Sequence, residues 1–432
     1  MQKYLRWSAI LAVMLLVLAA CGPAASPGES TEESAEASAG ASEDIAAVCA
    51  ADPFGCVEIA AGDPIRLASA LSIVGDTAAL GNDANFGIEV AIDDRGEVFG
   101  RTVDLVKEDA GCGEAEDGQT AAQAIVADQS IVGVIGTTCS RTAVPAMPVL
   151  AEAGLVMISP SNTAPSLTNP DNADFGGPFY FRTAYNDQVQ GAAVAQFVCD
   201  ELPEATTAAT IHDGSPYAEQ LQQVFVDDFA EICGGTTTTQ EAINVGDQDF
   251  STVLTTIGAD SPDILFVPIF SPEGPLVTRQ SQDVAGLADT ILIGADGLKD
   301  GSFITAAGDI GEEIGMYFSG PDLNLGTAYT DDFLPKYLEK ASLEQPLAPY
   351  HAHGFDAANI FFDAIEAVGL EDADGTLWIP RDAVREYVAT LTDFPGLTGN
   401  LTCDEFGDCG SEFVSIAQLV DGVYSEVYTT RP

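Results

Sequence analysis

The chain has 432 residues, and its 67 acidic and 15 basic residues give a formal net charge of −52 at pH 7. A polyanion of this size repels nucleic acid and anionic lipid headgroups, so we expect no nucleic-acid partner. The chain is too long for one ordinary hydrophobic core, and two lobes are expected.

The N-terminus has the pattern of an export signal. It reads MQKYLRWSAILAVMLLVLAAC, in which basic residues precede a short apolar stretch that ends in small residues. We expect a signal peptide at 1–20; the alternative, an uncleaved anchor helix, needs about 20 apolar residues, and this stretch is shorter. The stretch Leu18-Ala19-Ala20-Cys21 resembles the lipobox of bacterial lipoproteins, which predicts a lipidated Cys21 and an extracytoplasmic, membrane-anchored protein.

The segment 21–47 is acidic, rich in Ser, Ala and Glu, and almost free of large apolar residues. Such a segment buries too little surface to offset the entropy lost on ordering. We therefore expect a flexible tether at 21–47 and a folded part that starts near residue 49.

The nine cysteines point to disulfides. Without Cys21, eight remain in a chain that carries an export signal, and no C-x-x-C spacing is present. A bonded Cys139 is not free to act as a nucleophile. Proximity along the chain predicts these pairs: Cys49–Cys56, Cys403–Cys409, Cys112–Cys139 and Cys199–Cys233.

From residue 64, apolar β-rich runs alternate with helical patterns, which indicates parallel sheets built from βαβ units. In the first half we expect strands at 64–71, 102–109, 131–135, 155–159 and 179–183 and helices around 86–92, 117–129 and 142–153. In the second half we expect strands at 205–213, 234–243, 263–270 and 290–296 and helices at 187–202, 216–231, 250–258 and 273–285.

The last third has too few strands for another domain of this kind, so it should add to the first two lobes. It predicts helices at 328–341, 350–368 and 380–391 and a hairpin at 397–428 with Phe406-Gly407-Asp408 at its turn. The G-x-G at 111–113 does not link a strand to a helix, so no dinucleotide cofactor is expected.

Several expected strands end in small polar loops. These loops are GTTCSRT, SPSNTAPSLT, HDGSPYAEQ, FSPEG and GADGLKDG. Ligands of parallel sheets bind beyond the carboxyl ends of the strands, and a helix start with hydroxyls and free N–H groups favours an anion. The last loop adds the carboxylate of Asp296.

Six stretches together resemble the branched-chain amino-acid-binding (Leu/Ile/Val-binding) family of ABC-transporter substrate-binding proteins. The stretches are GDTAALGNDANFGIEVAIDD, VGVIGTTCSRTAVPAMPVLAEAGLVMISPSNTAPSLT, IHDGSPYAEQL, VGDQDFSTVL, ADGLKDGSF and HGFDAANIFFDAI. The resemblance implies an α/β fold of the periplasmic-binding-protein type I class, in which a multi-crossover hinge joins two doubly wound parallel-sheet lobes. We assign 64–183 with 320–396 to the first lobe and 184–319 with 397–432 to the second.

The resemblance also implies a small-molecule ligand, closed between the lobes and delivered to ABC permease subunits in the membrane. Ser140 and Thr163, helped by Ser161, correspond to the cradle for the ligand carboxylate. Tyr217 would join from the second lobe, and Asp296 falls where the family places an acidic residue against the ligand ammonium. No catalytic residue, metal or cofactor is implied.

Two departures concern the side-chain pocket. Leu80 stands where relatives specific for branched aliphatic amino acids have a large aromatic residue, and Phe270 replaces a tyrosine. Asp296 is one methylene shorter than the glutamate of those relatives. A neutral amino acid remains the expected ligand, without a commitment to leucine.

Other readings stay open. A Ser-His-Asp hydrolase would need a base near its serine, and the sequence has no G-x-S-x-G elbow. His351 and His353 could bind zinc, but the sequence offers no third ligand of comparable character. A calcium loop at 371–376 lacks its other ligand positions. The same fold could also bind an amide, urea or aromatic acid, or serve as a sensor rather than in transport.

Overall fold

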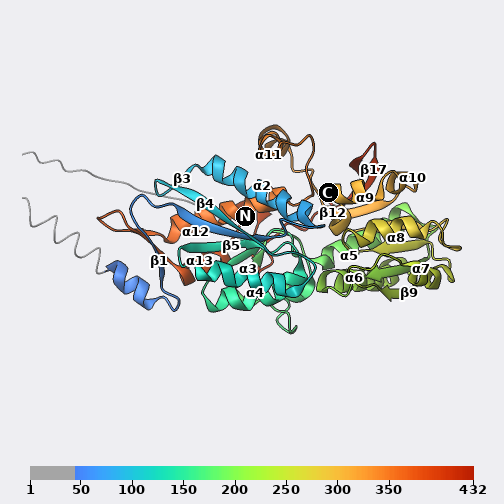
Figure 1. Cartoon of the computed structure of the whole chain (residues 1–432), viewed down its shortest axis with the longest axis horizontal. Helices are drawn as coiled ribbons and strands as arrows, with labels where there is room; N and C mark the ends of the chain where they lie inside the picture. The colour runs from blue at the N-terminus through green and yellow to red at the C-terminus, as the bar shows by residue number, and fades with distance from the viewer. Residues whose placement is uncertain (1–43) are drawn as a thin grey trace, which may run out of the picture.

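The computed structural model describes residues 44–432, so the expected signal peptide and Cys21 lie outside the described part. Two lobes lie side by side along the longest axis of the molecule (Figure 1). Residues 44–51 form a helix, so the last residues of the expected tether, 44–47, are helical. The disulfide Cys49–Cys56 ties this helix to the strand that follows.

The first lobe is built on a six-stranded sheet. All its pairings are parallel except that of β3 with β4, as the alternating sequence pattern predicted. The order across the sheet is β3 (Glu97–Val98), β4 (Arg101–Asp109), β2 (Ile65–Leu71), β5 (Ile131–Gly136), β6 (Met157–Ser159) and β7 (Tyr180–Arg182).

Helices cover both faces of this sheet because its central strands are apolar on both sides. Val132 and Ile135 pack on the face covered by α2, α12 and α13, and Ile131 and Val134 pack on the face covered by α3 and α4. A Cβ at Gly133 would lie 2.2 Å from the Phe361 ring, so glycine lets α12 approach β5 closely. The helices are α2 (Ala78–Arg95), α3 (Ala115–Ala127), α4 (Ser140–Glu152), α12 (His351–Val368) and α13 (Arg381–Ala389).

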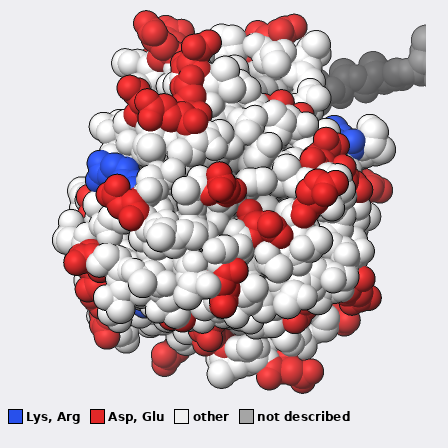
Figure 2. All heavy atoms as spheres, turned by 90° about the vertical axis from the view of Figure 1, so that its right-hand side faces the viewer, with Lys and Arg blue, Asp and Glu red and all other residues white. Residues whose placement is uncertain are grey.

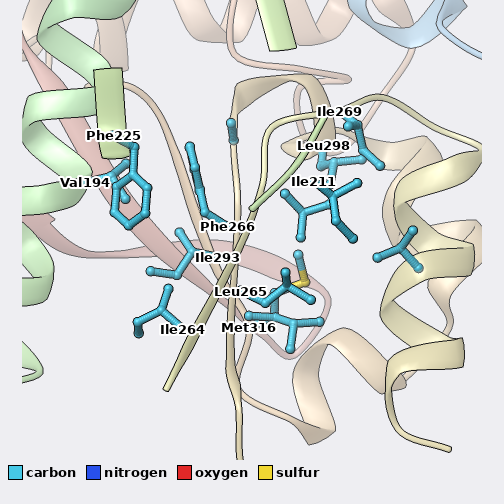
Figure 3. Close-up of a cluster of buried hydrophobic side chains, with 14 of the residues drawn as sticks. Val194, Ile211, Phe225, Ile264, Leu265, Phe266, Ile269, Ile293, Leu298 and Met316 are labelled. Atoms are coloured by element: carbon cyan, nitrogen blue, oxygen red, sulfur yellow. The ribbon is translucent and has the colours of Figure 1, made fainter. Parts of the chain in front are cut away.

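The second lobe is built on a seven-stranded sheet whose strands β12, β17 and β18 pair antiparallel. The order is β18 (Val423–Thr429), β17 (Val414–Val420), β12 (Tyr317–Pro321), β11 (Ile291–Gly294), β10 (Ile264–Val267), β8 (Thr207–His212) and β9 (Thr236–Ala242). Its helices are α5 (Asp187–Glu201), α6 (Pro216–Cys233), α7 (Ser251–Gly258), α8 (Glu273–Ser281), α9 (Gly301–Ala307) and α10 (Ile310–Glu313). Figure 3 shows the core of this lobe, where Phe225 and Phe266 pack with aliphatic side chains of the strands.

The chain crosses between the lobes repeatedly. It leaves the first sheet after β7, returns after β12 through η4 (Ala328–Phe333) and α11 (Leu334–Ala341), and crosses again before β17. These crossings form the hinge. A small sheet of β1 (Cys56–Ile59), β14 (Leu377–Pro380) and β13 (Leu370–Glu371) and the pair β15 (Phe394–Pro395) and β16 (Asn400–Leu401) complete the first lobe.

The hairpin predicted at 397–428 is wrong. The hairpin is β17–β18, and Asp421 and Gly422 form its turn with positive φ angles of 51° and 73°. The segment before it packs against the first lobe, where Cys409 lies in the core and Asp408 pairs with the buried Arg182. We expected residues 397–409 in the second lobe, but the structure places them in the first. A buried guanidinium requires a carboxylate partner, and Asp408 supplies this partner to Arg182 of the first lobe.

All four predicted disulfides are present. Cys112–Cys139 joins the loop after β4 to the start of α4, with the two Cα atoms 5.4 Å apart. Cys139 is therefore a structural residue and not a nucleophile.

The surface is strongly acidic. Figure 2 shows Asp and Glu side chains spread over the end of the second lobe, with few Lys or Arg among them. Across residues 44–432, no helix has the length and apolar character needed to cross a membrane.

Candidate ligand-binding site

Six of the seven predicted binding residues meet in one small space between the lobes. It measures about 260 Å³ and is lined by Leu80, Thr138, Ser140, Ser161, Tyr217, Phe270, Asp296 and Tyr350. Thr163 is buried close by without lining it. A larger pocket of about 740 Å³ lies between 345–349 and β17–β18, and it contains none of the predicted residues.

The first-lobe wall is formed by the ends of β5 and β6. Helix α4 begins at Ser140, directly after the β5 turn, and Ser140 lines the space, so the N-terminal end of the helix lies beside it. The Ser140 hydroxyl accepts a hydrogen bond from the Ala164 N–H at 3.3 Å, and the Ser161 hydroxyl donates to the Thr138 carbonyl at 2.9 Å. These contacts bring hydroxyls from both loops together beside a positive helix end, an arrangement suited to a carboxylate.

A buried arginine fixes the second of these loops. The Arg182 guanidinium donates to the carbonyls of Asn162 at 3.2 Å and Ala164 at 2.9 Å, and it pairs with Asp408. Thr163 lies between the two anchored carbonyls. The loop therefore keeps its shape without a ligand.

The second-lobe wall centres on Asp296, which lies at the end of β11. Its Oδ1 atom accepts hydrogen bonds from the Tyr217 hydroxyl at 2.8 Å and the Gln190 amide at 2.9 Å. Burial raises the pKa of Asp296, and the hydrogen bonds that it accepts oppose that rise. The Tyr217 ring also packs on Phe270, with the ring centroids 5.0 Å apart.

Tyr350 connects the two walls. Its backbone N–H donates to Asp83 of α2, in the first lobe, at 2.8 Å, while its hydroxyl donates to Oδ2 of Asp296, in the second lobe, at 2.8 Å. Asp83 also accepts from the Tyr337 hydroxyl at 2.6 Å and pairs with His351 at 3.1 Å. These bonds hold the start of α12 on α2. The Tyr350 side chain extends from this anchored position across the site to Asp296.

Further contacts join the lobes around this space. Arg141 of α4 pairs with Asp213 at 3.8 Å and donates to its carbonyl at 3.2 Å. The Ser166 N–H donates to Gln220 of α6 at 2.8 Å, and the Gln220 amide donates back to the Ser166 hydroxyl at 2.9 Å. The structure is thus a closed arrangement of the two lobes.

Sequence reasoning missed Thr138, Gln190 and Tyr350. Thr138 stands in the same GTTCSRT turn as Ser140, so its position was already marked by the strand end. Tyr350 directly precedes the His351-Ala352-His353 motif, but neither its spacing nor its neighbours indicate that it crosses to Asp296. Gln190 carries no sequence signal that we can identify.

The histidine motif is structural. His351 is held by Asp83 and, through Nε2, by the Tyr329 hydroxyl at 2.9 Å, while burial lowers the pKa of His353 to about 3. Within residues 44–432, no group of three or more His, Cys, Asp or Glu side chains is arranged to hold a metal ion.

The chain is similar to known proteins over most of its length. The model of a family described as periplasmic binding protein matches residues 64–411. The Leu/Ile/Val-binding protein BraC3 of Rhizobium johnstonii is 29% identical, covering 80% of this chain and 88% of the relative. A Pseudomonas aeruginosa protein that binds leucine, isoleucine, valine, threonine and alanine is 28% identical, covering 81% and 88%. A leucine-binding protein, LivK, of Thermotoga maritima superposes with a TM-score of 0.74 at 25% identity, covering 85% of this chain and 99% of that one.

Proposed function

Because this chain belongs to the periplasmic binding protein family, as the sequence motifs predicted, we propose that it is the extracytoplasmic substrate-binding lipoprotein of an ABC importer. Its ligand is a neutral amino acid held between the closed lobes. The family consists of solute-binding proteins rather than enzymes, and a ligand site between two lobes fits this role.

One observation carries the ligand class: the two walls of the site have opposite electrostatic preferences. Ser140 and Ser161 meet beside the positive N-terminus of α4, and Asp296 faces them from the second lobe. A zwitterion presents a carboxylate to the first wall and an ammonium to the second. Neither wall alone would distinguish an amino acid from a simple acid or amine.

The size and lining of the site favour a small side chain. Only about 10 Å³ of this space is open to a water-sized molecule, so the closed arrangement leaves no room for a large side chain. Leu80 and Phe270 supply its apolar walls, which suit an uncharged aliphatic side chain. The Pseudomonas aeruginosa relative, which binds leucine, isoleucine, valine, threonine and alanine, has ligands with uncharged side chains.

Delivery and anchoring complete the proposal. Cys21 carries the lipid anchor, the segment after it acts as the tether, and ABC permease subunits receive the ligand. Genes for a permease and an ATPase next to this one would favour transport, whereas a neighbouring kinase gene would favour the sensor alternative.

A thermal-shift screen of the folded part tests the ligand class. A ligand at a hundredfold excess over Kd stabilises the folded state by about 2.7 kcal/mol, so a true ligand should stand out in a panel of amino acids, amides, urea and aromatic acids. We expect neutral amino acids to give the largest shifts. If every stabilising compound lacks an amino group, the amide, urea or aromatic-acid alternative replaces this proposal.

A further inference from the structure

The pocket between 345–349 and β17–β18, here called the accessory cavity, is roomier than the site between the lobes. About 190 Å³ of it is open to a water-sized molecule, against about 10 Å³ in that site. A cavity of about 150 Å³ lined by apolar side chains holds a benzene molecule. The accessory cavity therefore has room for a small organic molecule.

The walls of the accessory cavity are mainly apolar, but they contain one basic residue. This residue is Lys299, which is only 7% exposed. Lysine is almost never buried so deeply unless its ammonium is paired. The apolar walls include Ile304, Leu323, Leu347, Pro349, Val423 and Tyr424.

The buried ammonium of Lys299 has few partners. Its Nζ atom donates to the Ser415 hydroxyl at 3.3 Å, and within residues 44–432 this is its only hydrogen bond. The Ser415 hydroxyl in turn donates to the Pro321 carbonyl at 3.2 Å. An ammonium has three N–H donors, so two remain for a further acceptor. A buried charge without an opposite charge is costly, which indicates that an anion completes this site.

The charges around Lys299 leave the position for an anion open. Burial lowers the pKa of Lys299 to about 8, and the carboxylates of Glu426, Asp322 and Asp296 act in the opposite direction, so the ammonium stays mostly charged at pH 7. Asp322 is already paired with Arg431 at 2.7 Å, and Glu426 is exposed. None of the three carboxylates forms an ion pair with Lys299 in the part of the chain that the structure describes.

The fold holds Lys299 in this position. A Cβ at Gly320 would lie 3.1 Å from the Cδ atom of Lys299, so glycine leaves room for the lysine stem to pass over β12. The Tyr424 hydroxyl lies 2.9 Å from the carbonyls of Leu298 and Asp300, which ties the loop around Lys299 to β18. The ammonium is therefore placed at the cavity by packing on both sides.

We propose that the accessory cavity is a second binding site, that it takes a small organic carboxylate with an apolar, benzene-sized body, and that Lys299 binds the carboxylate. The apolar walls cover the body, and the two free N–H donors of Lys299 meet the carboxylate oxygens. This site is separate from the site between the lobes and does not depend on the function proposed for that site.

An occupant of the accessory cavity contacts both lobes. The segment 345–349 is held on the first lobe, because the Ala348 N–H donates to Asp83 of α2 at 3.1 Å. The opposite wall, with Lys299 and β17–β18, belongs to the second lobe. The same segment leads directly into Tyr350, which crosses the amino-acid site. Occupancy should therefore favour the closed arrangement and raise the affinity of the first site for its ligand.

Fluorine NMR with 4-fluorobenzoate, a carboxylate with a benzene-sized body, tests the proposal. The wild type should bind it, and it should bind 4-fluorobenzamide, which has the same shape without the charge, about 10-fold more weakly. Lys299→Met keeps the length of the stem and removes the ammonium, so affinity for 4-fluorobenzoate should fall by about 30-fold or more. The amide should bind this variant and the wild type alike.

Glu426→Gln gives a second measurement, which survives a Lys299 variant that folds poorly. Glu426 is an exposed residue of the cavity lining, and its negative charge opposes an incoming carboxylate. Its neutralisation should raise affinity for 4-fluorobenzoate about threefold. Glu58→Gln, at an exposed position of β1 in the first lobe, is the matched control and should bind like the wild type.

Ser140→Ala separates the two sites. A carboxylate bound in the cradle between the lobes loses affinity in this variant, whereas one bound at Lys299 keeps it. The proposal is wrong if the wild type does not bind 4-fluorobenzoate at about 10 mM, if neither Lys299→Met nor Glu426→Gln changes its affinity by more than about twofold, or if Ser140→Ala weakens binding as much as Lys299→Met does.

Calorimetry with L-leucine, L-valine and L-alanine tests the link between the sites. The amino acid that binds best should bind more tightly, by about threefold or more, when 4-fluorobenzoate is present at saturation. An unchanged affinity would overturn the link. If none of the three amino acids binds the wild type, the proposed function fails, while the titrations with 4-fluorobenzoate still decide whether Lys299 forms a second site.

Discussion

Tyr350→Phe should weaken ligand binding by destabilising the closed arrangement of the lobes. The substitution removes only the hydroxyl that donates to Asp296 at 2.8 Å, while the backbone bond to Asp83 at 2.8 Å and the ring remain. Because Tyr350 is anchored on the first lobe and Asp296 belongs to the second, the lost hydrogen bond exists only when the lobes are closed.

The size of the effect follows from the charge of the acceptor. A hydrogen bond to a charged group contributes about 1.5–3 kcal/mol, and Asp296 is buried, so water does not replace the lost donor in the closed form. If binding requires closure, apparent affinity should fall by about 10- to 150-fold. Calorimetry with the amino acid that gives the largest thermal shift measures this change.

Tyr217→Phe provides a matched control for closure. Tyr217 donates to the same carboxylate at 2.8 Å but from the same lobe, so its bond survives opening. Small-angle scattering of the ligand-free proteins should show a larger radius of gyration for Tyr350→Phe and an unchanged one for Tyr217→Phe. The reasoning is refuted if Tyr350→Phe changes neither the radius nor the affinity, or if both variants open the protein equally.

Three more predictions concern stability and anchoring. Replacing Cys112 and Cys139 together by serine should lower the free energy of unfolding by about 3.5 kcal/mol, since the bond closes a loop with a sequence separation of 27; urea unfolding measures this, and a loss below about 1 kcal/mol would contradict it. Burial lowers the pKa of His353 from 6.5 to about 3 in the folded protein, so between about pH 7 and pH 5 only the unfolded chain takes up a proton at this residue. Lowering the pH from about 7 to about 5 should therefore reduce the free energy of unfolding of the wild type by about 2 kcal/mol more than that of His353→Gln. Equal losses in urea titrations at the two pH values would count against this account. Cys21→Ala should release the protein from the membrane fraction and abolish labelling by fatty acid, and an unlabelled wild type would show that Cys21 is not lipidated.

Much of the candidate site was predictable because its residues stand in short local patterns. Ser140 and Asp296 each follow an apolar strand, and the carboxyl ends of parallel strands meet at one edge of a sheet. The family resemblance then distinguished these residues from ordinary helix caps.

The sequence by itself determined the alternation of strands and helices, the two lobes and the four disulfides. These features depend on hydrophobic periodicity and on cysteines close along the chain, which are local properties. Only the tertiary structure decided which lobe holds residues 397–409 and which residue crosses the site. Arg182 keeps Asp408 on the first lobe, and Tyr350 reaches Asp296 from its anchor on Asp83. Each of these choices rests on burying a charged or polar group against a partner that is distant in sequence, and no local pattern records that partner.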